Sequence, residues 1–201
     1  MSAIISDISN TISPPCVSDP DVSEHLVHFY EHEDELLDRL TAYCGSALRT
    51  GDSTLLIATP AHLDTLQRRL RGTGVDLTQA ILEDRYICLD AETTLARFMV
   101  GGQPDGRLFR EFLSRPARRA CMHNRRIHAF GEMVALLWER GETAAALELE
   151  RLWNQAIAEQ PMTLLCAYPL KVLGREFAAA TSSICAEHSG VSGLGEHCQA
   201  A

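Results

Sequence analysis

Apolar residues are arranged along the chain in short continuous runs that alternate with helix-spaced patterns. A run of four to seven apolar or β-branched residues bounded by turn residues is typical of a buried strand. Apolar residues that recur every three or four positions are typical of an amphipathic helix. Five runs predict strands, at residues 25–30, 53–59, 86–89, 127–130 and 163–168. Their alternation with helices predicts an α/β three-layer sandwich with a mainly parallel central sheet.

The segments between these runs predict the helices. One helix follows Tyr30 and ends at the Gly51-Asp52 break, and the next begins at Pro60, an allowed first position for proline. Further helical patterns occur at residues 75–82, 95–98, 108–121, 133–140, 143–159 and 175–185, with a turn at residues 101–106.

The 201 residues favour one domain of ordinary size, with a tail at each end. Residues 1–24 are rich in Ser, Pro and Asp, and we expect them to form a flexible tail. Residues 189–201 are rich in Gly and Ser, and we expect them to be loose, with a C-terminal tail from residue 192 onward. The folded domain is therefore predicted to span residues 25–191.

Charge and cysteine content indicate the cellular compartment and exclude some classes of binding partner. The net charge of -9 argues against direct binding to nucleic acid or to an anionic membrane surface. The seven cysteines are odd in number and lack the spacing of a small secreted domain. The N-terminus has no signal-peptide pattern, and no apolar run is long enough to span a membrane. These features predict a cytoplasmic protein with free thiols.

Polar and soft side chains interrupt the apolar strands. In an open α/β sheet, ligands bind beyond the carboxyl ends of the strands, which brings Tyr30, Thr59, Asp90, Glu132 and Tyr168 toward one rim. Side-chain alternation places His25 and His28 on opposite faces of their strand. The predicted ligand-binding residues are His25, His28, Tyr30, Glu132, Cys166, Tyr168 and His188.

The most specific form of this hypothesis places Glu132, Cys166 and His188 around one concavity, with Tyr30 on its wall. The simpler interpretations are that Glu132 stabilises the first turn of a helix, that Cys166 is a small buried hydrophobe and that His188 is a helix cap. A nucleophilic enzyme built on Cys166 ranks lower, because nothing in the spacing selects a base for it.

A metal site and a nucleotide site are two further alternatives. Cys185 and His188 lie on one helical face, and His197-Cys198 is near in sequence, so these four residues could hold zinc or another transition metal. Each is also an ordinary core or surface residue. ATP binding is not expected, because residues 30–35 contain several carboxylates and neither the glycine nor the lysine of a phosphate loop.

The sequence resembles the MEDS family, the methanogen/methylotroph sensory domain first described in a dichloromethane-responsive regulator. The resemblance covers residues 25 to about 191. It rests on His25-Leu26-Val27-His28-Phe29-Tyr30-Glu31, Ala58-Thr59-Pro60-Ala61-His62, Leu89-Asp90-Ala91, Phe130-Gly131-Glu132-Met133-Val134, Leu147-Glu148-Leu149-Glu150-Arg151-Leu152-Trp153-Asn154, Leu165-Cys166-Ala167-Tyr168-Pro169 and Ile184-Cys185-Ala186-Glu187-His188-Ser189.

This resemblance implies a RecA/KaiC-like fold and a role in sensing small hydrocarbon derivatives. Family members commonly accompany DNA-binding or histidine-kinase output domains. Since no output domain follows here, we expect a non-enzymatic sensory domain that binds a small organic ligand and signals to a partner protein, a kinase or a transcription regulator. The alternatives are a ligand-free interaction module in a kinase or sigma-factor circuit and a degenerate RecA-like nucleotide-binding protein. A homodimer is compatible with each of these functions.

Overall fold

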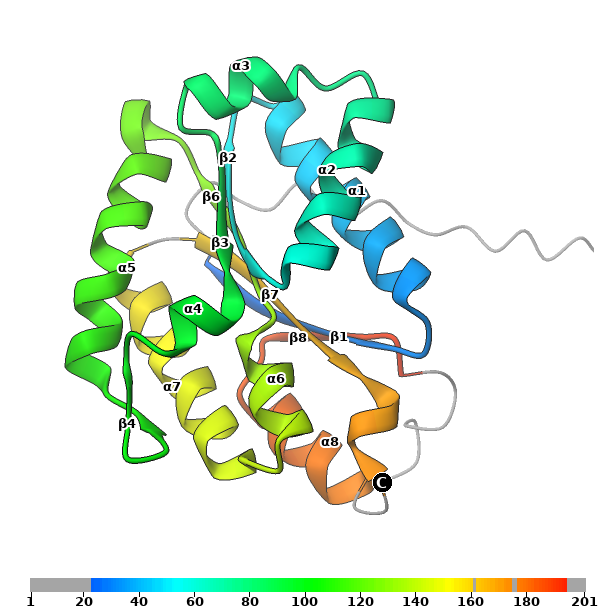
Figure 1. Ribbon diagram of the computed structural model, residues 1–201, viewed down its shortest axis with the longest axis vertical. Helices are drawn as coiled ribbons and strands as arrows, with labels where there is room; N and C mark the ends of the chain where they lie inside the picture. The colour runs from blue at the N-terminus through cyan, green and yellow to red at the C-terminus, as the bar shows by residue number, and fades with distance from the viewer. Residues whose placement is uncertain (1–22, 161, 175–176, 195–201) are drawn as a thin grey trace, which may run out of the picture.

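The computed structural model describes residues 23–160, 162–174 and 177–194, and its centre is a parallel β-sheet (Figure 1). Within this part of the chain the sheet has six strands in the order β3-β2-β6-β7-β1-β8. All of its neighbouring strands pair in parallel. The strands are β1 (Glu24–Tyr30), β2 (Ser53–Ala58), β3 (Tyr86–Asp90), β6 (Ile127–Gly131), β7 (Met162–Pro169) and β8 (Gly190–Ser192).

Helices cover both faces of the sheet and complete three layers (Figure 1). One face carries α1 (Glu33–Arg49), α2 (Pro60–Gly72) and α3 (Leu77–Leu82). The opposite face carries α4 (Ala91–Leu95), α5 (Gly106–Ala120), α6 (Met133–Glu139), α7 (Thr143–Glu159) and α8 (Phe177–Ala186). Short 3-10 helices lie at Met122–Asn124 and Leu170–Val172. Each helix in the described ranges is too short or too polar to span a bilayer.

The predicted fold class is confirmed, as are the five predicted strands. Every residue of β2 and β7 is buried. This burial explains why their sequences read as continuous apolar runs, since helices cover them on both faces. Side chains of β1 alternate as predicted: Val27 and Phe29 face α4–α8, and Tyr30 faces α1–α3.

The C-terminal segment is a correction to the sequence analysis. Residues 189–201 were expected to be loose, but Gly190–Ser192 forms β8 at one edge of the sheet, paired with β1. A three-residue strand is too short to show a periodic pattern. Backbone hydrogen bonding explains its formation, because the Ser189 amide donates to the His25 carbonyl at 2.7 Å. The N-terminal tail through residue 22 and residues 195–201 lie outside the described residues.

The segment between β3 and α5 also differs from expectation. The helix predicted at residues 95–98 lies earlier, at Ala91–Leu95, because the Asp90 carboxylate caps it by accepting a 2.7 Å hydrogen bond from the Thr93 amide. The predicted turn is the tip of a small hairpin, β4 (Met99–Val100) and β5 (Gln103–Pro104). Gly101 and Gly102 both have positive φ, as a two-residue hairpin turn requires.

Candidate functional site

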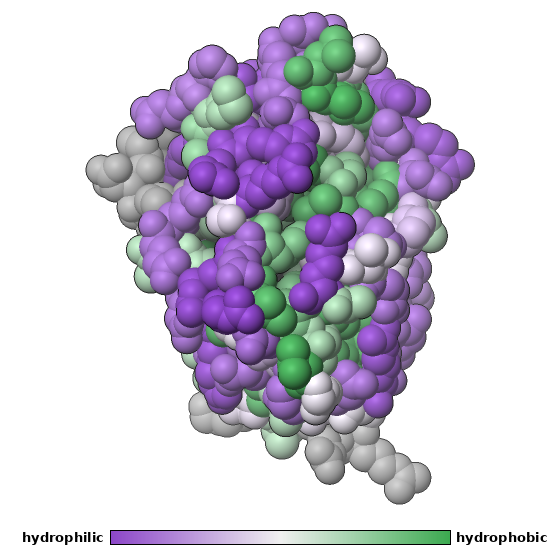
Figure 2. Space-filling view, turned by 60° about the vertical axis from the view of Figure 1, so that its left-hand side comes forward, coloured by the Kyte–Doolittle hydropathy of each residue, from purple (hydrophilic) through white to green (hydrophobic). Residues whose placement is uncertain are grey.

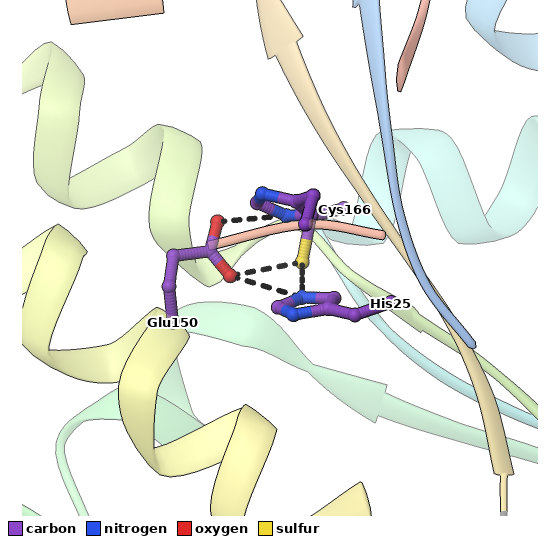
Figure 3. A group of neighbouring side chains, drawn as sticks. His25, Glu150 and Cys166 are labelled. Carbon is purple, nitrogen blue, oxygen red and sulfur yellow. Dashed lines mark hydrogen bonds and ion pairs between the residues drawn. The ribbon is translucent and has the colours of Figure 1, made fainter. Parts of the chain in front are cut away.

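Four side chains from distant parts of the sequence meet between the sheet and the α4–α8 layer. His25 comes from β1, Glu150 from α7, Cys166 from β7 and His188 from the link between α8 and β8. One potential ligand atom from each lies within 4.8 Å of all the others. Figure 3 shows His25, Glu150 and Cys166 pointing toward one another. We call these four residues the His–Glu–Cys–His cluster.

The cluster is closed to solvent. The side chains of Glu150 and His188 have no exposed surface, and that of His25 is 4% exposed. His25 Nε2 lies 3.2 Å from Glu150 Oε2 and 3.4 Å from Cys166 Sγ. Cys166 Sγ lies 3.3 Å from Glu150 Oε2, and His188 Nε2 lies 3.5 Å from Glu150 Oε1. Isolated charges are costly to bury, so this carboxylate must be balanced locally.

Hydrogen bonding and nearby histidines keep Glu150 ionised. Burial by itself raises the pKa of Glu150, but hydrogen bonding to His25, the nearby rings of His188 and His25 and the hydrogen bond from the Tyr168 hydroxyl outweigh it, so the pKa lies below its ordinary value. Tyr168 donates its hydroxyl proton to Glu150 Oε1 at 2.7 Å. Burial and the Glu150 charge raise the pKa of both Tyr168 and Cys166 well above the usual range.

Both histidines of the cluster are oriented by a hydrogen bond through Nδ1. His188 Nδ1 lies 2.7 Å from the Ile184 carbonyl, which can only accept, so Nδ1 carries the proton. His25 Nδ1 lies 2.8 Å from Asn154 Oδ1. The orientation of the Asn154 amide is fixed because its Nδ2 donates to the Glu187 carbonyl at 3.0 Å. Both Nε2 atoms therefore face the interior of the cluster.

One of these inward-facing nitrogens is not satisfied. Among the described residues, His188 Nε2 is buried and has no hydrogen-bond partner. Burial lowers the pKa of His188, so the ring is neutral and presents a lone pair toward Glu150 Oε1. A buried polar atom without a partner is costly and calls for an explanation, of which a bound ion is one.

A second polar group lies at the carboxyl ends of the strands. Glu132, at the end of β6, accepts hydrogen bonds at 2.7 Å from the Thr59 amide and from His62 Nδ1. His62 Nε2 pairs with Glu33. Hydrogen bonding to Glu132 exceeds the opposing effect of burial, and with the Glu33 contact it raises the pKa of His62 to about 9. The group is an ion-paired connection between α1, α2 and β6.

The structure brings four of the seven predicted ligand-binding residues together: His25, Cys166, Tyr168 and His188. The other three lie elsewhere. Glu132 makes its hydrogen bonds to Thr59 and His62, and Tyr30 packs in the core under α1–α3. His28 faces away from the cluster and contacts Ser192 Oγ through Nδ1 at 3.2 Å.

The four metal ligands predicted from the sequence are not the four residues that lie together in the structure. Cys185 is not among the four clustered residues, and His188 is. His197 and Cys198 lie outside the described residues. The Glu132 side chain also does not cap the first turn of α6, since it reaches the Thr59 amide instead.

Sequence reasoning missed Glu150, Asn154 and His62. A signal for Glu150 was present in the helical pattern of α7. Ala146, Leu149 and Trp153 are fully buried, and a carboxylate at position 150 falls on the same apolar stripe. A charged residue at a core position is more informative than the apolar residues around it.

A groove on the outer surface is a separate feature. Figure 2 looks toward the left-hand side of Figure 1, where apolar surface lies in a furrow between hydrophilic surfaces. The groove runs along α5 and has a volume of about 540 Å³. Its lining consists of Leu89, Arg97, Leu108, Glu111, Phe112, Arg115, Pro116 and Arg119. It combines an apolar floor with several arginines.

Comparison with known families identifies the chain. The profile of the MEDS family, the methanogen/methylotroph, DcmR sensory domain, matches residues 24–184. The chain belongs to the MEDS family. The matched region contains the first three residues of the cluster, and His188 follows it by four positions. No curated protein matches the chain significantly. Membership in a sensory-domain family indicates a sensory or regulatory role.

Proposed function

We propose that this MEDS domain is a non-enzymatic sensor whose His–Glu–Cys–His cluster responds to a small organic ligand, and that it signals to a partner protein. The observation that carries the proposal is the burial of four ionisable side chains in contact with one another between the sheet and the α4–α8 layer. Buried ionic groups often contribute no more to stability than well-packed hydrophobic residues of similar volume. Polar groups retained at such a cost are expected at functional sites.

The position of the cluster suggests how ligand binding there could affect a partner protein. His188 is two residues before β8, and the next residue, Ser189, is bound to His25. The Ser189 amide and hydroxyl donate to the His25 carbonyl at 2.7 and 3.0 Å. A change at the cluster would therefore alter the attachment of β8 to β1. Because β8 is an edge strand, its outer backbone groups can pair with a partner protein.

The absence of enzymatic chemistry is part of the proposal. The nucleophilic form of cysteine is the thiolate, and burial beside Glu150 raises the pKa of Cys166. Its side chain is also fully buried. These properties favour a structural or sensing thiol over a catalytic one.

A ligand screen combined with hydrogen exchange tests this function. Thermal shifts would be measured with a panel of small alcohols, aldehydes, haloalkanes and aromatic hydrocarbons, with the wild type, Cys166→Ala and Cys44→Ala. Cys44 is the matched control, because it is equally buried but packs under α1–α3. We expect at least one compound to stabilise the wild type and Cys44→Ala but not Cys166→Ala, and to change exchange at residues 190–192. If no compound has these effects, the proposal is wrong.

The second candidate function is an interaction module without a ligand, which the groove along α5 favours. Arg97, which lies over the Phe112 ring, and Arg115 both line the groove, and this combination of arginines and apolar surface suits an acidic segment of a partner protein. In-cell cross-linking of the wild type, Arg115→Glu and Cys166→Ala separates the two functions. This alternative predicts that only Arg115→Glu loses its cross-links.

A further inference from the structure

The His–Glu–Cys–His cluster has the donor atoms, the spacing and the supporting contacts of a metal centre. We propose that His25 Nε2, Glu150, Cys166 Sγ and His188 Nε2 bind one transition-metal ion of the zinc class. This inference adds a bound metal ion to the proposed function. It rests on the proposed function only where it treats the cluster as the sensing centre.

The distances within the cluster match those between ligands of a tetrahedral metal ion. Bonds from zinc to nitrogen, oxygen and sulfur measure about 2.0–2.3 Å, which separates the ligand atoms of a tetrahedron by about 3.3–3.8 Å. His25 Nε2, Cys166 Sγ and Glu150 Oε2 lie 3.2–3.4 Å from one another. His188 Nε2 lies 3.5 Å from the other Glu150 oxygen. All four ligand atoms lie within 4.8 Å of one another, so movement of His188 toward the other three would complete a coordination sphere.

The histidines are prepared for coordination by their outer contacts. A metal-binding histidine almost always donates its second ring N–H to a carbonyl or carboxylate, which fixes the tautomer and the ring orientation. His188 does so to the Ile184 carbonyl, and His25 does so to Asn154 Oδ1. Tyr168 likewise donates to Glu150 Oε1 and holds the carboxylate in place. This support explains why both Nε2 atoms point inward.

A metal ion would also relieve one unfavourable contact in the cluster. His188 Nε2 is buried without a hydrogen-bond partner among the described residues, and it faces a carboxylate oxygen. A divalent cation between His188 Nε2 and Glu150 would replace this repulsion with a bond to each of the two side chains.

Charge and donor type select the class of metal. Two neutral imidazoles, one thiolate and one carboxylate carry two negative charges, which a divalent ion neutralises in a site that is closed to solvent. A mixed nitrogen, sulfur and oxygen set suits zinc, cobalt or nickel and does not suit magnesium or calcium, which prefer oxygen ligands. Binding releases the proton of the Cys166 thiol to solvent as the Sγ–metal bond forms.

Metal stoichiometry and cobalt spectroscopy test the inference on the full chain. A chelator would remove bound metal from the protein, which would then be loaded with zinc or cobalt and dialysed. Mass spectrometry would measure the number of metal ions per chain. We expect one ion per chain, and the cobalt form should show a thiolate-to-cobalt charge-transfer band and visible bands of tetrahedral cobalt. Cys166→Ser should lose the charge-transfer band, and Cys44→Ser, the matched control, should keep it.

A conservative variant tests the role of the supporting contacts. Tyr168→Phe removes only the hydrogen bond to Glu150, and we expect zinc affinity to fall about 10–100-fold while the fold, measured by circular dichroism, is retained.

Two outcomes would overturn the inference. In the first, the stripped wild type binds neither zinc nor cobalt stoichiometrically. In the second, the Cys166→Ser variant keeps the cobalt–thiolate band. The sensory proposal fails separately. If the protein binds the metal but no compound in the panel stabilises it, only the sensory proposal is wrong. If the protein binds no metal but a compound stabilises it, only the metal inference is wrong.

Discussion

Asn154 Oδ1 lies 2.8 Å from His25 Nδ1, although the two residues are 129 positions apart in the chain. The same amide donates through Nδ2 to the carbonyl of Glu187. Asn154 therefore connects α7, the first strand and the segment that leads into β8. This connection fixes the His25 ring and makes the cluster dependent on tertiary structure rather than on any local motif.

Replacement of the buried carboxylate is expected to be strongly destabilising. Glu150→Gln removes the charge that pairs with His25 and accepts from Tyr168, so we expect the free energy of unfolding to fall by about 3–5 kcal/mol. Chemical denaturation of the metal-free protein measures this change. Glu148→Gln is the matched control on the same helix. The ion pair of Glu148 with Arg151 is exposed, so this change should cost less than about 1 kcal/mol. Equal losses in the two variants would contradict a special role for Glu150.

The pH dependence of stability should report on His62. The pKa of His62 rises from 6.5 unfolded to about 9 in the folded state. A raised pKa means that the folded state holds the proton more tightly. The stabilisation is therefore fully present below pH 6.5 and is lost as the pH rises to about 9. Thermal denaturation of the wild type should show this loss, and His62→Gln should flatten the profile in that interval. The exposed His32 provides a control, and a His32→Gln profile that flattens equally would refute the assignment.

The turn after β8 depends on a glycine for two reasons. Gly193 has φ +83°, and a Cβ atom at this position would lie 1.8 Å from the Phe29 carbonyl oxygen. We expect Gly193→Ala to detach the end of β8 and to speed hydrogen exchange at residues 190–192. Gly51→Ala is the matched control, since Gly51 has φ +88° but open space around it. This control should cost only the backbone penalty of about 1–2 kcal/mol and leave exchange in β8 unchanged. Unchanged exchange in Gly193→Ala would contradict the steric argument.

Nucleotide binding should be absent. Glu31 lies in the link from β1 to α1, and Glu33 and Glu35 lie in the first turn of α1. The Glu31 amide, which a phosphate would need, donates instead to Glu35 Oε2 at 3.0 Å. These carboxylates would repel phosphate oxygens, so titration calorimetry with Mg-ATP should detect no heat of binding. A measured dissociation constant in the micromolar range would favour the degenerate nucleotide-binding alternative.

The sequence by itself determined five of the six strands in the described sheet and most of the helices. Strands such as β2 and β7 are buried on both faces, so their composition alone identifies them, and helix spacing identified α1, α2 and α7. Local hydrophobic patterning is strong where an element is long and its burial is uniform. The predicted alternation of His25 and His28 follows from the same strand geometry and is confirmed by their opposite contacts.

Only the tertiary structure decided which polar residues share a site. The sequence places Cys166 and Glu132 at or near the carboxyl ends of two predicted strands. In the structure, however, the side chain of Cys166 points toward α7 and that of Glu132 points toward α2. Glu150 joins the cluster because the packing of α7 on β1 and β7 sets its direction, which periodicity along one helix cannot fix. Strand order and the pairing of β8 with β1 likewise depend on long-range hydrogen bonds. These contacts between residues far apart in sequence leave no local pattern, so the cluster could be assembled only by folding the whole chain.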